Sequence, residues 1–506
     1  MSWLPTVLLG RRGAALLVAA LLLPQLLLWP RTSDDAYITF RYLVNVGQGH
    51  GLVFNVGERV EGFSHPLYLA LLSPALAVAS DGAALESWAK LVGVLATLGT
   101  ASMILDLLRR SAGSLAGIAA GMLLLLGAPG VHVYASAGLE TPLLACLLAA
   151  VVWMEVRGSG WSAPLIGLAP LIRPEGILYP VMWLLVRAVR SPSRGRRLVL
   201  PALLALSPIC AYEVFRVLYY GDWLPNTFYA KPPGLFGGPR GWADLLPLAL
   251  GAPLIAFGHR VARARSPEIA RGWSLALAFV IAGSAFVLYA RRDWMLFGRL
   301  VVPVWPLAAW LMAHGVTSLV RSAASWRRIA APTLVVAVLV GFGLDARRAG
   351  REPGVVEVMR GRAQLAGGEW LAGQIATGET VATARLGGFG YRLLHHTVWD
   401  IAGLTDREVA RHIYRTGKLD WARHPVAARR PDWQAVVVDF TCGCLVHADP
   451  ELERDLAQNY RLVGTVPQGP SQAWKFFRRR SVAAPVAAGE DQPRGRAYAS
   501  ASSERR

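Results

Sequence analysis

The chain contains little acid and few cysteines. Of its 506 residues, 33 are Asp or Glu against 52 Lys or Arg, and only 17% are charged. Four cysteines are too few for the disulfide framework of a small secreted domain. The pair in Cys442-Gly-Cys444 offers too few ligands for a structural zinc ion, so it is either a strained disulfide or two free thiols. Since acid is scarce, each acidic cluster is informative.

Long hydrophobic runs are abundant. The chain is 54% hydrophobic with a mean hydropathy of +0.38, and apolar runs recur over roughly the first 345 residues. This pattern predicts a polytopic α-helical membrane protein with one appended soluble domain. The net charge of +19 would suggest nucleic acid as the partner of a soluble protein. Here the arginines cluster in short loops between apolar runs, which favours the positive-inside rule and a lipid bilayer over nucleic acid.

The apolar runs predict about eleven transmembrane helices. The first is an uncleaved span, because Arg11-Arg12 and the apolar run that follows meet no Ala-x-Ala site before Asp34. Residues 66–80 are apolar but short, which favours a re-entrant or surface helix. The expected spans are 13–30, 86–108, 112–129, 141–156, 161–173, 175–190, 198–219, 243–259, 272–290, 298–320 and 329–345.

The arginine bias orients these spans. With the N-terminus in the cytoplasm, the basic clusters between spans all fall on the inner side of the plasma membrane. The sequence then divides into a membrane module (1–346) whose first outer loop (31–80) carries surface helices, an extracytoplasmic α/β domain (347–480) and a disordered tail (481–506). In the α/β domain, residues 379–384 and 433–439 resemble buried strands, and the segment around 370–375 has helical spacing.

Five polar clusters fall at the outer ends of the expected spans, and their convergence indicates a site. Ionisable residues at a membrane edge are costly and are functional candidates by default. The alternative is that outer loops are simply polar. The clusters are Asp34-Asp35, His132 to Glu140, Arg173 to Gly176, Tyr219 to Lys231 and Arg291 to Met295.

The pair Asp34-Asp35 follows Ser33, which is a typical helix N-cap. Acids in a first helical turn favour the helix dipole by about 0.3–1 kcal/mol each, and this structural role is one explanation. The other is that one acid is a general base that takes the proton of an attacking sugar hydroxyl. Tyr37, Phe40 and Val44 share one side at helical spacing, which suits a helix lying on the membrane.

The motifs around this pair are similar to a known family. They resemble the GT-C polyprenyl-phosphate glycosyltransferases, and among these the terminal arabinofuranosyltransferases of cell-wall arabinan. The block from Asp34 to Tyr42, with Gly49 to Gly62 and His65-Pro66, is specific. Weaker matches follow in the same order over most of residues 30–440. They are Gly138-Leu-Glu-Thr-Pro142, Arg173-Pro-Glu-Gly176, Pro225 to Lys231, Asp293-Trp-Met295 with Arg299, and Val398 to Asp406.

The resemblance implies a transferase on the outer face that moves a sugar, D-arabinofuranose, from a polyprenyl-phosphate donor to a cell-envelope glycan. In similar enzymes the first acid of the pair lies at the reaction centre, which makes Asp34 the expected base and Asp35 its support or a ligand of the acceptor. The chain departs from the common pattern at Arg291-Arg292 and after Met295, so the loop shape near Asp293 differs from that of the family.

A lipid phosphate leaving group requires cations near it, and Arg is geometrically suited to phosphate. Arg173, Lys231, Arg299 and Arg41 are the candidates. Each has a structural alternative. Arg173 can pair with Glu175, Arg41 can pair with an acid, and Lys231 and Arg299 can extend to lipid headgroups.

The expected substrate contacts are His65, Glu140, Tyr229, Asp293 and Trp294. Tyr229 and Trp294 can stack on the sugar or prenyl chain, although aromatic residues at a membrane boundary are more often belt residues. His65 can equally be a packed side chain, and Glu140 can order a cation. The acid pair could hold a divalent ion, as in some GT-C relatives, but relatives with lipid-monophosphate donors resemble metal-free enzymes, and no metal or other cofactor is expected.

Three other functions compete with this one. A GT-C transferase could use another lipid-linked sugar, with a lipid or protein acceptor. A transporter of lipid-linked sugar would show repeated halves and ionisable residues at mid-membrane, and neither is evident. A glycan-binding protein with a membrane anchor would not need eleven spans.

Overall fold

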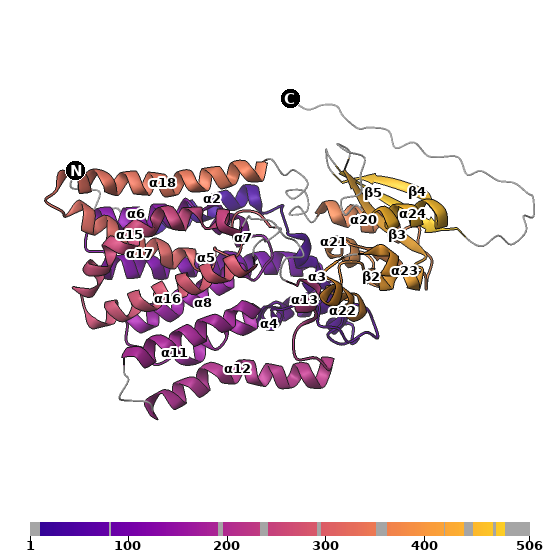
Figure 1. Ribbon diagram of the computed structural model, residues 1–506, viewed down its shortest axis with the longest axis horizontal. Coiled ribbons are helices and arrows are strands. Elements are labelled where there is room, and N and C mark those ends of the chain that lie inside the picture. Colours follow the sequence, from indigo (N-terminus) through magenta and orange to yellow (C-terminus); the bar gives the residue numbers. More distant parts are fainter. Residues whose placement is uncertain are drawn as a thin grey trace, which may run out of the picture.

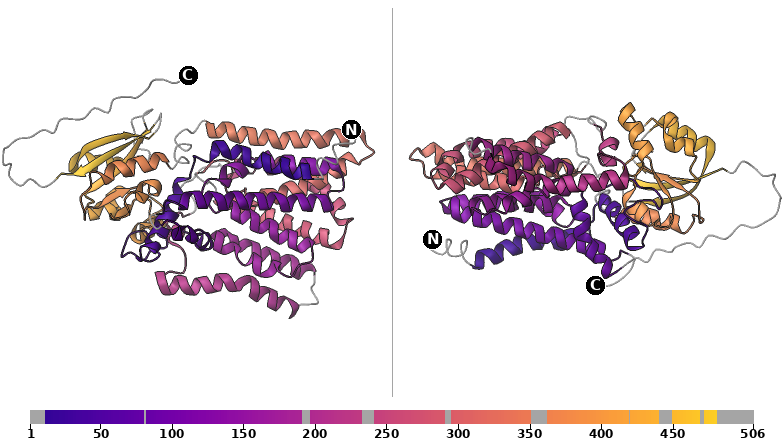
Figure 2. Two further views of the ribbon diagram at one scale, coloured as in Figure 1. Left: turned by 180° about the vertical axis from the view of Figure 1, so that it is seen from behind. Right: turned by 90° about the horizontal axis from the view of Figure 1, so that it is seen from below.

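The protein is described by a computed structural model, which covers residues 11–79, 82–190, 196–232, 241–290, 295–350, 362–418, 420–439, 449–468 and 472–480. Long helices lie side by side in a bundle, and a unit built on a β-sheet sits at one end of it (Figure 1). Views from behind and from below show the sheet unit at that same single end (Figure 2). We call this end of the bundle the sheet end.

The bundle is formed by apolar sequence with few breaks. Its longer helices are α2 (Arg11–Leu28), α5 (Leu85–Ser111), α6 (Leu115–Leu126), α8 (Thr141–Val156), α11 (Leu178–Arg190), α12 (Arg196–Tyr220), α15 (Leu246–Arg263), α16 (Pro267–Ala290), α17 (Trp305–Val320) and α18 (Ser325–Gly350). Helix α17 lies at the centre, since nearly all its residues are buried. Gly315 lets α17 approach α15 closely, because a Cβ there would lie 1.9 Å from the carbonyl oxygen of Leu254.

Four helices in the described part of the chain are long and apolar enough to cross a membrane, and they make this an integral membrane protein. They lie at Leu85–Ser111, Leu198–Tyr220, Pro267–Ala290 and Ser325–Arg348. A fifth is formed if α6 and α7 (Pro129–Ala135), which bend by 54° at their break, count as one span. The expected count of eleven is therefore not confirmed. Residues 161–173, expected as one span, form two short helices, α9 (Ser162–Ile166) and α10 (Ala169–Ile172).

The arginine-rich loops gather at the end of the bundle away from the sheet. Asp106 near the end of α5 accepts hydrogen bonds from Arg110 and from Arg157, which follows α8. Arg190 at the end of α11 donates to the carbonyl oxygen of Ala270 in α16, and Arg321 after α17 donates to that of Gly113. Helix α2, the first described element, also begins at this end (Figure 1). The basic loops thus share one end, as the charge bias predicts.

Short helices occupy the sheet end of the bundle. They are α3 (Asp34–Gly47), α4 (Pro66–Leu72), η1 (Ser73–Ala77), η2 (Pro174–Ile177), α13 (Asn226–Ala230) and α14 (Gly241–Asp244). The expectation that α3 lies on the membrane surface is wrong. Tyr37, Phe40 and Val44 are buried, but so are Tyr42 and Leu43 on its other sides, because the sheet unit covers the helix. The short helix expected within 66–80 is present as α4 and η1.

The sheet unit has five strands in the order β2-β1-β3-β5-β4. Strands β2 (Val398–Asp400), β1 (Val381–Thr383) and β3 (Trp433–Asp439) pair in parallel. Strand β5 (Gln472–Arg479) pairs antiparallel with both β3 and β4 (Tyr460–Pro467). The helices of this unit are α20 (Arg362–Ala372), α21 (Gly387–Tyr391), α22 (Arg407–Thr416), η4 (Trp421–Arg423), α23 (Pro425–Arg429) and α24 (Pro450–Asn459). The strands expected at 379–384 and 433–439 are confirmed as β1 and β3.

Buried polar side chains join the sheet unit to the bundle. Arg41 of α3 is 1% exposed, and its guanidinium donates to five acceptors, which are the carbonyl oxygens of Phe54, Gly390, Leu393 and His396 and the amide oxygen of Asn55. Asn55 also pairs with both backbone groups of Val398 at the edge strand β2. Asn226 of α13 donates to the carbonyl oxygens of Gly403, Leu404 and Asp406. The two parts therefore share one interface.

We expect Arg41→Gln to lower the midpoint of thermal unfolding of the detergent-solubilised protein by several degrees. The variant leaves buried carbonyl groups without donors, which costs about 1–3 kcal/mol for each group. Arg392→Gln, which removes an exposed pair with Glu369, is the matched control and should leave the midpoint within error of the wild type. Equal midpoints for both variants would show that Arg41 does not hold the interface.

Candidate active site

The acid pair lies where α3 begins. Ser33 precedes the helix in extended conformation (φ −66°, ψ 143°), as an N-cap residue does, but its side chain makes no capping hydrogen bond. Its backbone N–H instead donates to the carbonyl oxygen of Ala137 at 2.9 Å, which ties the helix start to the segment before α8. Asp34 is buried and Asp35 is half-buried. The two acids therefore occupy different environments although they are adjacent.

Asp34 faces the sheet unit. The backbone N–H of Gly388, at the start of α21, donates to Asp34 Oδ1 at 2.7 Å. Gly387 permits this approach, because a Cβ there would lie 2.0 Å from the carbonyl oxygen of Asp34. Burial raises the pKa of Asp34 to about 7, against the opposing effects of the Gly388 hydrogen bond and the nearby charge of Arg385. A carboxyl group with this pKa can exchange a proton near neutral pH.

Glu140 organises a second set of charges beside the pair. Its Oε1 accepts from Arg173 Nη1 at 2.6 Å and from Arg299 Nη2 at 3.1 Å. Arg299 Nη1 also lies 3.9 Å from Asp35 Oδ2, which links the acid pair to Glu140. Burial alone would raise the pKa of Glu140, but Arg299 and Arg173 outweigh it and hold the pKa at about 2. Glu140 is therefore a fixed anion that orients two guanidinium groups.

Several polar atoms in this set are available for a ligand. Arg173 Nε binds Glu175, Nη1 binds Glu140, and Nη2 has no hydrogen bond to a described residue. Glu140 Oε2 and the hydroxyl of Tyr68 are buried without hydrogen-bond partners among the described residues. His65 Nδ1 lies 3.8 Å from that Oε2, and its Nε2 is 2.8 Å from Thr39 Oγ1. Since buried polar groups are normally paired, these orphaned atoms suit a polar ligand.

The structure brings together six of the residues singled out in the sequence, namely Asp34, Asp35, His65, Glu140, Arg173 and Arg299. It does not bring in Arg41. All five of its N–H donors are used by protein acceptors, so the expected phosphate contact, and the expected pairing with an acid, are wrong for this residue.

Tyr229 and Lys231 lie at the contact between α13 and α22. The Tyr229 ring lies 3.3 Å from the Arg411 guanidinium carbon and packs edge-on against Tyr414. Lys231 is exposed. Among the residues that the structure describes, no hydrogen bond or ion pair joins either side chain to Glu140 or the acid pair. Asp293 and Trp294, like Cys442 and Cys444, lie outside the described residues.

Residues missed in the sequence come mainly from the sheet unit. Arg385, Gly387 and Gly388 follow β1 directly and reach Asp34. A signal for them was present, because ligands meet the loops at the carboxyl ends of parallel strands and paired glycines let a backbone approach closely. Tyr68 of α4 carried no such signal. Within the described ranges, no three His, Cys, Asp or Glu side chains are grouped so that they could hold a metal ion.

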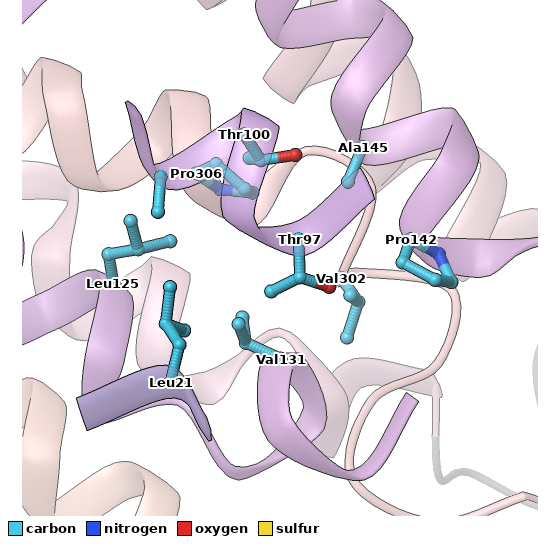
Figure 3. Close-up of a pocket in the computed structure, with 10 residues that line it drawn as sticks. Leu21, Thr97, Thr100, Leu125, Val131, Pro142, Ala145, Val302 and Pro306 are labelled. Atoms are coloured by element: carbon cyan, nitrogen blue, oxygen red, sulfur yellow. The ribbon is translucent and has the colours of Figure 1, made fainter. Parts of the chain in front are cut away.

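A pocket inside the bundle does not suit a sugar. Figure 3 shows its lining of apolar side chains with Thr97 and Thr100. Both hydroxyl groups donate to carbonyl oxygens one turn earlier in α5, so neither offers a donor to a ligand. The cavity measures about 10 Å³, room for one water. The polar cluster around Glu140 is therefore the better candidate for chemistry.

The comparison with solved structures identifies the fold. The chain matches the crystal structure of ArnT from Cupriavidus metallidurans bound to undecaprenyl phosphate over 94% of its length and 99% of that chain, with a TM-score of 0.56 and 14% identity. The match to the crystal structure of the same ArnT in the apo state covers 92% of this chain and 97% of that chain, with a TM-score of 0.54 and 15% identity. At this identity the likeness shows the fold alone. The chain is thus a membrane protein with the GT-C fold.

The more particular relatives come from sequence. The chain is 29% identical over 259 residues to the terminal beta-(1->2)-arabinofuranosyltransferase of Mycobacterium tuberculosis, which covers 45% of this chain and 41% of that protein. The chain is 28% identical over 250 residues to the enzyme of the same name from Corynebacterium glutamicum. That match covers 42% of this chain and 35% of that protein. The chain thus covers less than half the length of either. Residues 357–485 match a domain of unknown function (DUF8728). The chain is a GT-C-fold protein that resembles terminal arabinofuranosyltransferases, as its motifs predict.

We expect Asp34→Asn to gain stability relative to the wild type as the pH rises from about 4 to about 7. The folded protein keeps the Asp34 proton up to a pH of about 7, whereas the unfolded chain releases it near 3.8, so wild-type stability falls across this window. The difference in the free energy of unfolding should grow by up to about 4 kcal/mol. Thermal or denaturant unfolding at several pH values measures it. The control Glu453→Gln, at an exposed acid, should show the same dependence of unfolding free energy on pH as the wild type. If the difference between Asp34→Asn and the wild type were also independent of pH, the raised pKa of Asp34 would be contradicted.

Proposed function

We propose that this protein is a membrane glycosyltransferase that moves D-arabinofuranose from a polyprenyl-phosphate donor to a cell-envelope glycan. The observation that carries the proposal is Asp34, a buried carboxyl with a pKa of about 7, beside the cluster of Arg173, Arg299 and Glu140. The names of the sequence relatives support the sugar, and the undecaprenyl phosphate bound in the ArnT crystal structure supports the lipid.

The proposed reaction assigns a role to each group. A hydroxyl of the acceptor attacks the anomeric carbon while Asp34 accepts its proton. The bond between that carbon and the phosphate oxygen breaks, and the lipid phosphate leaves with the electron pair. Arg173 Nη2 and the Arg299 guanidinium stabilise the charge on the phosphate. Asp35 holds Arg299 in place, and Glu140 orients both arginines.

The remaining polar groups suit the sugar. Tyr68, Oε2 of Glu140 and His65 converge near the arginines and can bind hydroxyl groups of the donor. Burial lowers the pKa of His65, so at neutral pH it is an uncharged partner for a hydroxyl group. We propose that transfer needs no divalent metal, because the two arginines supply the positive charge for the phosphate.

The proposal also orients the chain. The end of the bundle with the basic loops and the beginning of α2 is placed in the cytoplasm, and the sheet end is placed on the outer face of the plasma membrane. The arginine bias supports this orientation. The acceptor then reaches the site from outside, between the bundle and the sheet unit, where Asp34 meets Gly388.

Transfer by the purified full chain in liposomes tests the proposal, with a panel of radiolabelled polyprenyl-phosphate sugars and an arabinan acceptor. We expect transfer from the arabinofuranose donor, a loss of at least about 100-fold in Asp34→Asn from removal of the base, and no loss in Glu453→Gln. EDTA should leave the rate unchanged. Full activity of a folded Asp34→Asn variant would show that Asp34 is not the base. Transfer of a different sugar would show that arabinofuranose is not the donor sugar. If no donor supported transfer, the result would favour the transporter over the transferase.

The rate should also depend on pH through Asp34. Since the base must be deprotonated, kcat/KM should rise about tenfold for each pH unit below about 7 and level off above it. Measuring the profile for the wild type and for Glu453→Gln, which should coincide, checks this. A rate that is flat between pH 5 and 7 would mean that no group with the pKa of Asp34 acts as the base.

A further inference from the structure

A groove rich in arginine lies on the sheet unit. Helix α22, η4 and α23 border this open groove, whose volume is about 960 Å³. Among the described residues its lining contains no Trp, Tyr or Phe and only one acid, Glu408, so it offers no platform on which a neutral sugar could stack. Five arginines line it, namely Arg407, Arg411, Arg415, Arg423 and Arg430. Such a lining selects an anion.

Three of the five arginines are available to a ligand. Arg415, Arg423 and Arg430 are exposed, and none forms an ion pair with a described residue. Arg430 has a φ of 50°, in the left-handed region where a helix normally ends in glycine. Its backbone thus places the Arg430 side chain at the groove where glycine would be less costly.

The groove begins at the level where a membrane helix ends. Arg407 and Arg411 line the groove, and both bind Asp222, two residues after α12. Figure 1 shows α13 beside α22, with α12 ending below them and joined to α13 by a short connection. Exposed aromatic side chains lie beside them, with Trp223 72%, Phe228 42% and Tyr414 47% exposed. Rings of this kind beside a span are typical of the headgroup level of a bilayer.

We propose that this groove binds the phosphate headgroup of an anionic phospholipid beside α12, and so holds the sheet unit on the membrane. Guanidinium groups match the geometry of a phosphodiester, and the exposed rings place the groove at the depth of the headgroups. Binding of an anionic polymer would account for the arginines alone. Binding of a lipid accounts both for the arginines and for the exposed rings of Trp223, Phe228 and Tyr414 beside them. The inference requires membrane insertion but not the proposed reaction, since the groove shares no residue with the cluster around Glu140.

Binding of short-chain lipid to the full-length protein in nonionic detergent tests the proposal. Calorimetry with dioctanoyl phosphatidylglycerol is compared with dioctanoyl phosphatidylcholine, inorganic phosphate and heparin. The groove variant is Arg415→Gln/Arg423→Gln/Arg430→Gln. The matched control, with the same change in charge, is Arg392→Gln/Arg454→Gln/Arg461→Gln, at exposed arginines of the same unit that do not line the groove.

We expect phosphatidylglycerol to bind more tightly than phosphatidylcholine, and the groove variant to lose roughly 100-fold of that affinity while the control keeps it. The Arg→Lys version of the groove variant should retain most of the binding, which separates lost charge from lost structure. Equal affinity in the groove variant, or no preference for phosphatidylglycerol, would overturn the proposal. Displacement of the lipid by millimolar inorganic phosphate would assign the groove to a free ion, and binding of heparin without lipid would assign it to a polymer.

Discussion

The structure depends on one constraint, which is that two buried ionisable side chains of α3 need partners from the sheet unit. Arg41 and Asp34 lie on this helix, and both are satisfied by backbone groups of the sheet unit. An unpaired charge at either position would be costly, so the sheet unit must dock in one orientation. The same docking buries Asp34 and thereby gives its carboxyl group an unusual pKa.

The two buried carboxyl groups Asp34 and Glu140 illustrate how environment assigns roles. Asp34 accepts a backbone N–H and is removed from water, and this burial raises its pKa to about 7. Glu140 meets two guanidinium groups, and its pKa is held at about 2. A site that separates its acids in this way has one group suited to move a proton and another suited to hold cations in place. The division follows from neighbours contributed by distant segments of the chain.

The sheet unit has a part in both proposals. Its loop after β1 completes the surroundings of Asp34, and its helix α22 contacts α13 through Tyr229 and the connection after α12 through Asp222. A unit held at both places is fixed relative to the membrane bundle. An arginine groove at headgroup level would add a third attachment, so lipid composition and the geometry of the site would be linked.

The sequence alone determined the membrane class, the shared end of the basic loops and the strands β1 and β3, because apolar length, charge bias and strand pattern are local properties. It also named most of the polar cluster, since ionisable residues at span ends are rare. The tertiary structure decided what these residues do. Arg41 and Arg173 look alike in the sequence, yet Arg41 is consumed by five protein acceptors whereas Arg173 keeps one nitrogen for a ligand. The local sequence could not predict that α3 is buried or that the backbone N–H of Gly388 binds Asp34. The partners in both cases lie far away along the chain, and only folding brings them together.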